Sequence, residues 1–139
     1  MAVKSKVSSS HALATVVATS FSKEIAGLTI IPFSKCSEQQ LRLIGKKADL
    51  KQNIFLALNT LYSQEGLFIE VEENAQIEGV FQLLFHAHGE NCFAPFRVFI
   101  HVKKGSAFKL IQQFTASGEH LFSLPIVEYL VEENAHISC

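Results

Sequence analysis

The sequence lacks an excess of charge of either sign. Its 139 residues carry 12 Lys and Arg against 13 Asp and Glu, for a formal net charge of -1 at pH 7. Proteins that bind nucleic acid or anionic lipid usually present a strongly basic face. The even charge balance therefore argues against DNA, RNA and acidic membranes as partners.

Long apolar runs and phosphate-binding motifs are missing as well. The longest apolar stretches, such as 28–33 and 81–85, are far shorter than the roughly 18 to 20 residues that cross a bilayer, so we expect a soluble protein. No GxxxxGK[ST] or GxGxxG pattern is present, and these are the usual cradles for nucleotide phosphates. Any ATPase is therefore expected to be a partner.

Cysteines are few and widely spaced. Cys36, Cys92 and Cys139 are odd in number and form no CxxC pair, which favours a reducing compartment over a disulfide framework. We therefore expect a cytoplasmic protein. A plastid is the alternative, because the first twenty residues are rich in serine and alanine and contain no acid, although they also lack arginine.

Two short helices are predicted in the first half of the chain, after a short strand at 13–18. Ser37 and Gln40 form a capping-box pattern for a helix that ends near Gly45. Asp49 is the expected N-cap of the second helix, and Gly66 is expected to close it. The apolar face of this second helix is predicted to comprise Ile54, Phe55, Leu58, Leu61 and Tyr62.

Beyond the helices the apolar period becomes alternating, as in strands with one buried face. Within this part, VEENAQI at 71–77, VKKGSAF at 102–108 and VEENAHI at 131–137 recur at about 30 residues. In each, Asn or Gly is expected to take a left-handed conformation at a corner, before a small residue begins the next strand. One such coil cannot cover its own apolar face, so its neighbours must stack on it.

The expected fold is therefore mainly β. It is the start of a β-helix, or solenoid, over 66–139, preceded by a small mixed α/β segment with two helices over 1–65. Only two residues follow Ile137, without a capping element. We expect either a chain truncated at its C-terminus or an edge-to-edge partner, which includes self-association.

Candidate residues for chemistry are sparse. His86 and His88 are expected to share one strand face, with Cys92 after a turn, and together they form a weak candidate for a zinc or iron site. The isolated histidines and the three cysteines lie in no catalytic motif. The pairs Glu72–Glu73 and Glu132–Glu133 are interpreted as solvated corners. We therefore assign no catalytic, cofactor-binding or metal-binding residue.

Three segments resemble one protein family. FLALNTL at 55–61, GLFIEV at 66–71 and NAHI at 134–137 are similar to the helix, strand entry and later coil of the SufB/SufD family of iron–sulfur cluster assembly proteins. IPFS at 31–34 resembles the segment just before. The order of these elements carries the resemblance, which covers about residues 28–139, and the SufD branch fits better than SufB.

The resemblance implies a right-handed parallel β-helix and a non-enzymatic scaffold role in the SUF complex, beside SufB-like and SufC-like proteins. The family's cluster-related residues and its SufC contacts match no position in this chain. No cofactor is therefore expected in this piece, although the parent complex assembles iron–sulfur clusters. The alternative is a small β-sandwich or cupin-like domain that binds a metal through His86 and His88.

Overall fold

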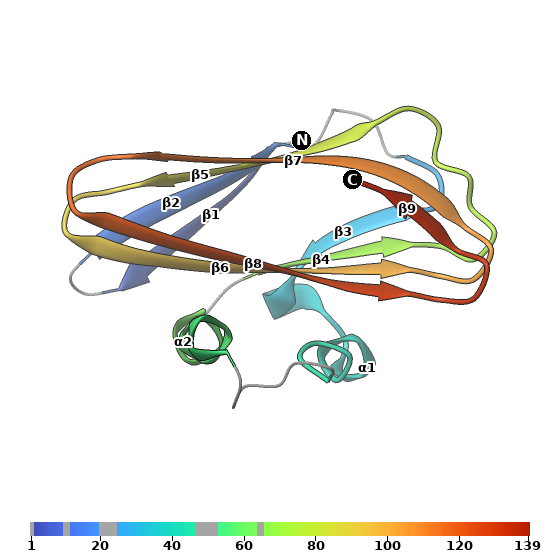
Figure 1. The fold of residues 1–139 in the computed structure, drawn as a ribbon, viewed down its shortest axis with the longest axis horizontal. Coiled ribbons are helices and arrows are strands. Elements are labelled where there is room, and N and C mark those ends of the chain that lie inside the picture. The colour runs from blue at the N-terminus through green and yellow to red at the C-terminus, as the bar shows by residue number, and fades with distance from the viewer. Residues whose placement is uncertain (1, 10–11, 20–24, 47–52, 64–65) are drawn as a thin grey trace.

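The computed structural model describes residues 2–9, 12–19, 25–46, 53–63 and 66–139, with the backbone alone for the first two ranges. The protein is mainly β, with two helices and two sheets that contain parallel strands, as expected. Two layers of strands face each other, and the helices lie outside one layer (Figure 1). No helix in these ranges has the length and apolarity needed to cross a bilayer.

The sheet beside the helices has four strands in the order β3-β4-β6-β8. Their bounds are β3 Leu28–Pro32, β4 Gly66–Val71, β6 Cys92–Val102 and β8 Leu121–Val131. The last three strands run parallel, while β3 pairs antiparallel with β4. The segment before residue 66 therefore contributes a strand to the same sheet as the segment after it.

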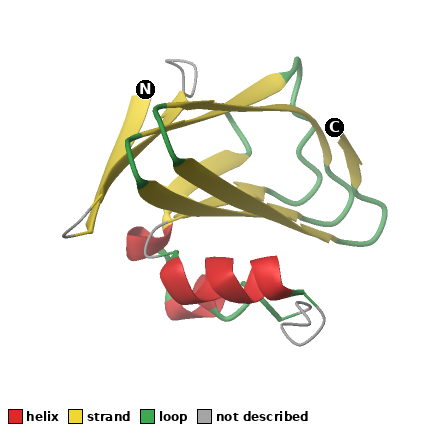
Figure 2. Cartoon of the chain, turned by 60° about the vertical axis from the view of Figure 1, so that its left-hand side comes forward, coloured by secondary structure: helices red, strands yellow, loops and turns green. Residues whose placement is uncertain are grey.

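The opposite sheet has three parallel strands in the order β5-β7-β9. Their bounds are β5 Phe81–His88, β7 Ala107–Ser117 and β9 His136–Ser138. From β4 onward the chain changes sheet at every strand. The even-numbered strands therefore lie side by side in one sheet and the odd-numbered strands in the other (Figure 2).

An antiparallel hairpin precedes these sheets. It comprises β1 (Ala2–Ser9) and β2 (Ala12–Thr19), and β2 lies against β5. The strand predicted at 13–18 falls within β2, so that prediction is confirmed. Figure 1 shows the hairpin beside the end of the two layers where β5 and β6 are joined.

The repeated segments occupy equivalent positions in the fold. Val71 pairs with Val102, and Val102 pairs with Val131. Each is followed by a corner with one left-handed residue: the φ angles are 61° at Asn74, 69° at Gly105 and 57° at Asn134. The prediction that the three segments are structurally equivalent is therefore confirmed.

The main core lies between the two sheets. Inward-facing residues alternate with outward-facing ones, so that Val98, Ile100 and Val102 pack in the core while Arg97 points outward. The core also contains residues of β4, β5 and β7: Leu67, Ile69, Val71, Phe81, Leu83, Phe85, Phe108 and Leu110. Burying each such side chain contributes about 1.5–3 kcal/mol to folding.

The helix caps agree with the sequence in one case and differ in the other. Helix α1 (Glu38–Leu41) begins at Ser37, which forms the predicted capping box with Gln40. Helix α2 (Ile54–Tyr62) is capped by Asn53, whose side chain accepts two backbone hydrogen bonds. Asp49, predicted as this cap, lies outside the described residues.

The prediction that Gly66 closes α2 is wrong. The helix ends at Tyr62 with Ser63 as its C-cap, and Gly66 is the first residue of β4. A side chain at this position has no room, because a Cβ atom would lie 2.3 Å from the ring of Phe33 and 2.5 Å from the carbonyl oxygen of Arg97. Glycine is required there by close packing.

The predicted apolar face of α2 is wrong for most of its residues, although Leu58 is partly buried and the Tyr62 ring packs edge-on against Phe93. Ile54 and Leu61 are 70% and 77% exposed, and Phe55 and Tyr62 are more than half exposed. Asn59 is the residue of α2 that is fully buried. Its Nδ2 donates to the carbonyl oxygens of Phe96 (3.0 Å) and Leu124 (2.8 Å). These hydrogen bonds to two neighbouring strands set the rotation of the helix and leave most of its apolar face outward.

Candidate functional site

A pocket lies where the two helical segments meet the outer face of the sheet. Its volume is about 400 Å³, within the range of cavities that hold small ligands. Its walls are a mixture of apolar and polar residues: Phe33, Leu41, Ile44, Gly45, Thr60, Ser63 and Arg97.

Arg97 forms the polar floor of this pocket. It is only 5% exposed, and the pleat of β6 directs it away from the core. Its Nε donates to Glu128 Oε1 and its Nη1 donates to Thr60 Oγ1 at 2.8 Å. The other oxygen of Glu128 accepts from the Gly45 backbone N–H at 3.0 Å. The Arg97–Glu128 pair thus joins β6 and β8 to both helical segments.

Arg97 Nη2 and Ser63 Oγ are both buried beside the pocket. Arg97 Nη2 is in close ionic contact with Glu128 Oε1, so the charge of the guanidinium is paired. Ser63 Oγ has no hydrogen-bond partner within the described part of the chain. Leaving a buried polar group unsatisfied costs about 1–3 kcal/mol.

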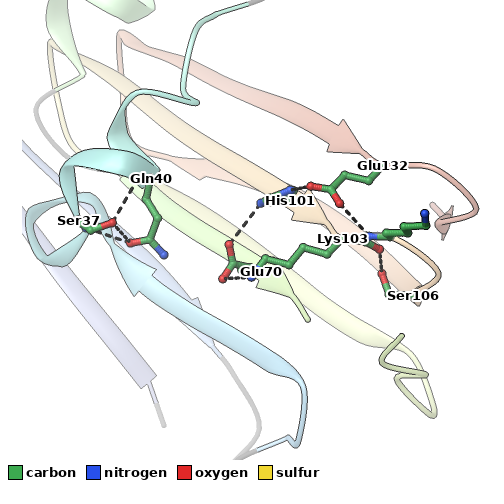
Figure 3. A network of polar contacts seen from close by, with 8 residues as sticks. Ser37, Gln40, Glu70, His101, Lys103, Ser106 and Glu132 are labelled. Atoms are coloured by element: carbon green, nitrogen blue, oxygen red, sulfur yellow. Dashed lines mark hydrogen bonds and ion pairs between the residues drawn. The ribbon is translucent and has the colours of Figure 1, made fainter. Parts of the chain in front are cut away.

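A second polar cluster, centred on His101, crosses the sheet near its corner (Figure 3). The Nδ1 atom of His101 lies 3.3 Å from Glu70 Oε2, and the Nε2 atom lies 2.7 Å from Glu132 Oε1. Lys103 Nζ contacts Glu70 at 3.0 Å, and the Lys104 backbone N–H donates to Glu132 at 3.0 Å. Each ring nitrogen thus lies beside a carboxylate oxygen, which can accept a hydrogen bond from it.

The prediction that the glutamate pairs are solvated is confirmed, since Glu72, Glu73, Glu132 and Glu133 are all exposed. Glu132 is also in hydrogen-bond contact with His101 and accepts from a backbone amide, which the sequence did not indicate. The hydrogen bond from His101, aided by that amide, lowers the pKa of Glu132 below its ordinary value of 4.5, against a smaller rise from burial.

This lowered pKa predicts a pH dependence. Glu132 stabilises the fold above pH 4.5, and this contribution is lost as the pH falls through its lower value in the folded state. We expect Glu132→Gln to reduce the loss of urea resistance on acidification. Urea unfolding on either side of pH 4.5 measures this, with exposed Glu73→Gln as the control. An equal acid sensitivity of Glu132→Gln and the unaltered protein would contradict the assignment.

His86 and His88 share one face of β5, as predicted, with ring centroids 6.4 Å apart. Each Nδ1 lies 2.9 Å from a hydroxyl of β7, that of Thr115 or Ser117. Cys92 is buried at the start of β6. Within the described residues no three His, Cys, Asp or Glu side chains form a metal-binding group. At this candidate metal site the structure therefore places two histidine rings, each with a ring nitrogen in contact with a hydroxyl group.

The cysteines lie in three separate places. Cys36 follows the 3-10 turn Phe33–Lys35, and its Sγ lies 3.6 Å from the Pro32 carbonyl oxygen. Burial, with a smaller effect from the charge of Glu70, raises the pKa of the Cys36 thiol, which opposes thiolate formation. Cys139 is exposed and lies 3.7 Å from the Tyr129 hydroxyl.

Sequence reasoning missed both polar clusters, although a signal was present. Arg97 and Glu128 lie one repeat apart, as do Glu70 and His101, and the same spacing separates His101 from Glu132. Aligning the charged residues at the repeat spacing, beside the apolar ones, would have placed these opposite charges on neighbouring strands.

Comparison with known proteins assigns no role to these clusters. No protein-family model matches the chain, and no curated protein is significantly similar to it. A function is therefore proposed from the repeat, the exposed surfaces and the chemistry of the polar groups.

Proposed function

We propose that the chain is a non-catalytic scaffold component of the SUF iron–sulfur cluster assembly complex. In this role it acts beside a SufB-like protein and a SufC-like ATPase, and the ATPase hydrolyses the ATP. The cluster is the cargo of the assembly, and the chain itself holds no cofactor. The proposed compartment is the cytoplasm, with a plastid as the alternative.

The observation that carries the proposal is the in-register stacking of Val71, Val102 and Val131 in one parallel sheet. The partner sheet repeats the same pattern, since β5 pairs with β7 and β7 with β9. Alternation between two stacked parallel sheets supports a β-helix that begins at β4, and we take it to be right-handed. This architecture agrees with the resemblance to the SufB/SufD family.

The surface at β8 and β9 supports a partner-binding role. Among the described strands, none pairs with the outer edge of β8 or of β9. One stack of aromatic rings ends on β8, where Phe122 stacks on Phe93 at 5.3 Å. A second stack ends on β7, beyond the part that β9 pairs with, where Phe114 stacks on Phe85 at 5.0 Å. Phe122 and Phe114 are nearly half exposed. A further strand layer would pair the free edges and cover the rings.

Co-purification tests the proposed function. The complete product of the gene, carrying an affinity tag, is co-expressed with the SufB-like and SufC-like proteins of the same genome. We expect both proteins to be retained at high salt, where ionic adsorption is screened. An unrelated tagged β-protein serves as the control. Retention of neither protein would contradict the scaffold role.

The exposed edge makes a second prediction. Phe122→Asp replaces the outermost ring of its stack with a carboxylate. Because the edge-to-edge contact would then have to bury this charge, association of the chain with itself or with a SufB-like partner should weaken by at least tenfold. Sedimentation velocity over a concentration series measures self-association. Glu38→Gln on α1, whose side chain is 90% exposed, is the control. Unchanged association of Phe122→Asp would place the interface elsewhere.

A further inference from the structure

We propose that the free edge formed by β8, the corner after it and β9 binds a coil of a partner protein in which two Lys or Arg residues are followed by a glycine. A coil is one strand of each sheet together with the corner that joins them. The contact rests on the proposed scaffold function, because it describes the surface that a SufB-like partner would present. The chain contains a template for it, since the coil of β6 stacks on the coil of β4.

The exposed corner after β8 is nearly a copy of a corner that is already covered. VEENAHI at 131–137 differs from VEENAQI at 71–77 at one position. Both corners turn at a left-handed asparagine, with φ angles of 57° at Asn134 and 61° at Asn74. The earlier corner is covered by VKKGSAF at 102–108, because β6 pairs with β4. The later corner is therefore shaped to accept a coil of the same kind.

The two corners also present the same edge. Strands β4, β6 and β8 run parallel in that order, so the edge of β4 that faces β6 corresponds to the edge of β8 that faces away from β6. The N–H of Asn74 and the carbonyl oxygen of Ala75 are hydrogen-bonded to the covering coil, each at 2.9 Å. Their counterparts, the Asn134 N–H and the Ala135 carbonyl oxygen, form no backbone hydrogen bond within the described residues. An added coil would supply partners for both.

The corner residue of the added coil is expected to be glycine. In the template, Gly105 lies over Asn74 with a φ angle of 69°, a conformation that β-branched residues rarely adopt. A Cβ atom at Gly105 would also lie 2.5 Å from Asn74 Oδ1. Because Asn134 repeats Asn74 in residue type and in backbone angle, it favours the same residue above it.

The charges at the corners favour a basic coil. Lys103 and Lys104 lie between two acidic corners, Glu72–Glu73 on one side and Glu132–Glu133 on the other, and Lys104 Nζ contacts Glu133 at 3.1 Å. An acidic coil on the free edge would place like charges side by side, which is destabilising. A basic coil would continue the alternation of sign. A second copy of the chain offers no such coil, because β6 is paired on both sides.

Three peptides test the proposal. The first, VFIHVKKGSAF, copies residues 98–108, the second replaces both lysines with glutamate, and the third replaces the glycine with valine. Each is labelled with fluorescein and titrated with the full chain, and fluorescence anisotropy measures binding. We expect saturable binding of the first peptide and about tenfold weaker binding of the other two. No saturable binding of the first peptide, or equal affinities for all three, would overturn the proposal.

Two observations locate the binding. Glu133→Lys reverses a charge at the exposed corner and should weaken binding of the first peptide about tenfold, whereas Glu73→Lys, at the equivalent position of the covered corner, should leave it unchanged. Circular dichroism establishes that both variants are folded. In NMR spectra of the unaltered chain, the amide signal of Asn134 should shift on binding and that of Asn74 should not. Equal effects of the two substitutions, or an unshifted Asn134 signal, would overturn the assignment to this edge.

The outcomes for this edge and for the scaffold role can be told apart. Co-purification of the SufB-like protein without peptide binding would contradict the basic coil alone, while peptide binding without co-purification would contradict the scaffold role alone. The complete product of the gene is titrated in parallel and should bind the first peptide as well. If it does not, its own residues cover the edge, and the assignment to a partner protein would be overturned.

Discussion

Arg97→Leu is expected to lower the free energy of unfolding by about 3–5 kcal/mol. The guanidinium is the counterion of Glu128, whose side chain is mostly buried, and it also donates to Thr60. Leucine leaves that carboxylate buried without a cation, and the link between β6 and α2 is lost as well. Urea unfolding monitored by circular dichroism measures the change.

Two further variants separate this effect from a general loss of charge. The double variant Arg97→Leu, Glu128→Leu removes both ions and should recover most of the lost stability, because no unpaired charge remains. Arg42→Leu breaks the pair with Glu38 on the surface of α1, where both side chains are at least 76% exposed. Its effect should be below about 1 kcal/mol. Equal losses in Arg97→Leu and Arg42→Leu would contradict the role given to the buried pair.

The strand region could be predicted well because two independent signals agree there. Alternation identifies the side chains that face the core between the sheets, although β4 and β6 are buried on both faces and not on one as predicted. The repeat of VEENA, VKKGS and VEENA fixes which residues lie side by side. A shift of one residue would turn every apolar side chain outward, so the register has little freedom. The left-handed Asn74, Gly105 and Asn134 then place the corners.

Helix α2 was predicted less well because its orientation depends on partners distant in sequence. The apolar pattern directs Ile54, Leu58 and Leu61 inward, but the buried contact is made by Asn59. Its amide reaches carbonyl oxygens of two strands that lie 37 and 65 residues further along the chain. No local period contains that information. Most of the apolar side chains of α2 are therefore exposed, apart from Leu58, which is partly buried.

The pocket could not be predicted for a related reason. Its lining is drawn from the 3-10 turn, the residues around α1, helix α2 and β6, and none of these segments carries a binding motif. What the sequence does hold is the charge pattern: Arg97 and Glu128 meet on neighbouring strands only because the repeat stacks them. The site is thus a consequence of the stacking, and it becomes visible only once the register is known.

Leu110→Ala is expected to lower the free energy of unfolding by about 2–5 kcal/mol, because it opens a cavity in the core between the sheets. Leu110 is 1% exposed, whereas its neighbour in β7, Ile111, is 53% exposed. Ile111→Ala is therefore a matched control that removes a side chain of the same size from the opposite face, and it should cost less than about 1 kcal/mol. Urea unfolding of both variants measures the difference. Equal losses, or a larger loss for Ile111→Ala, would mean that β7 presents its other face to the core, and the stacking of β5, β7 and β9 would then be wrong.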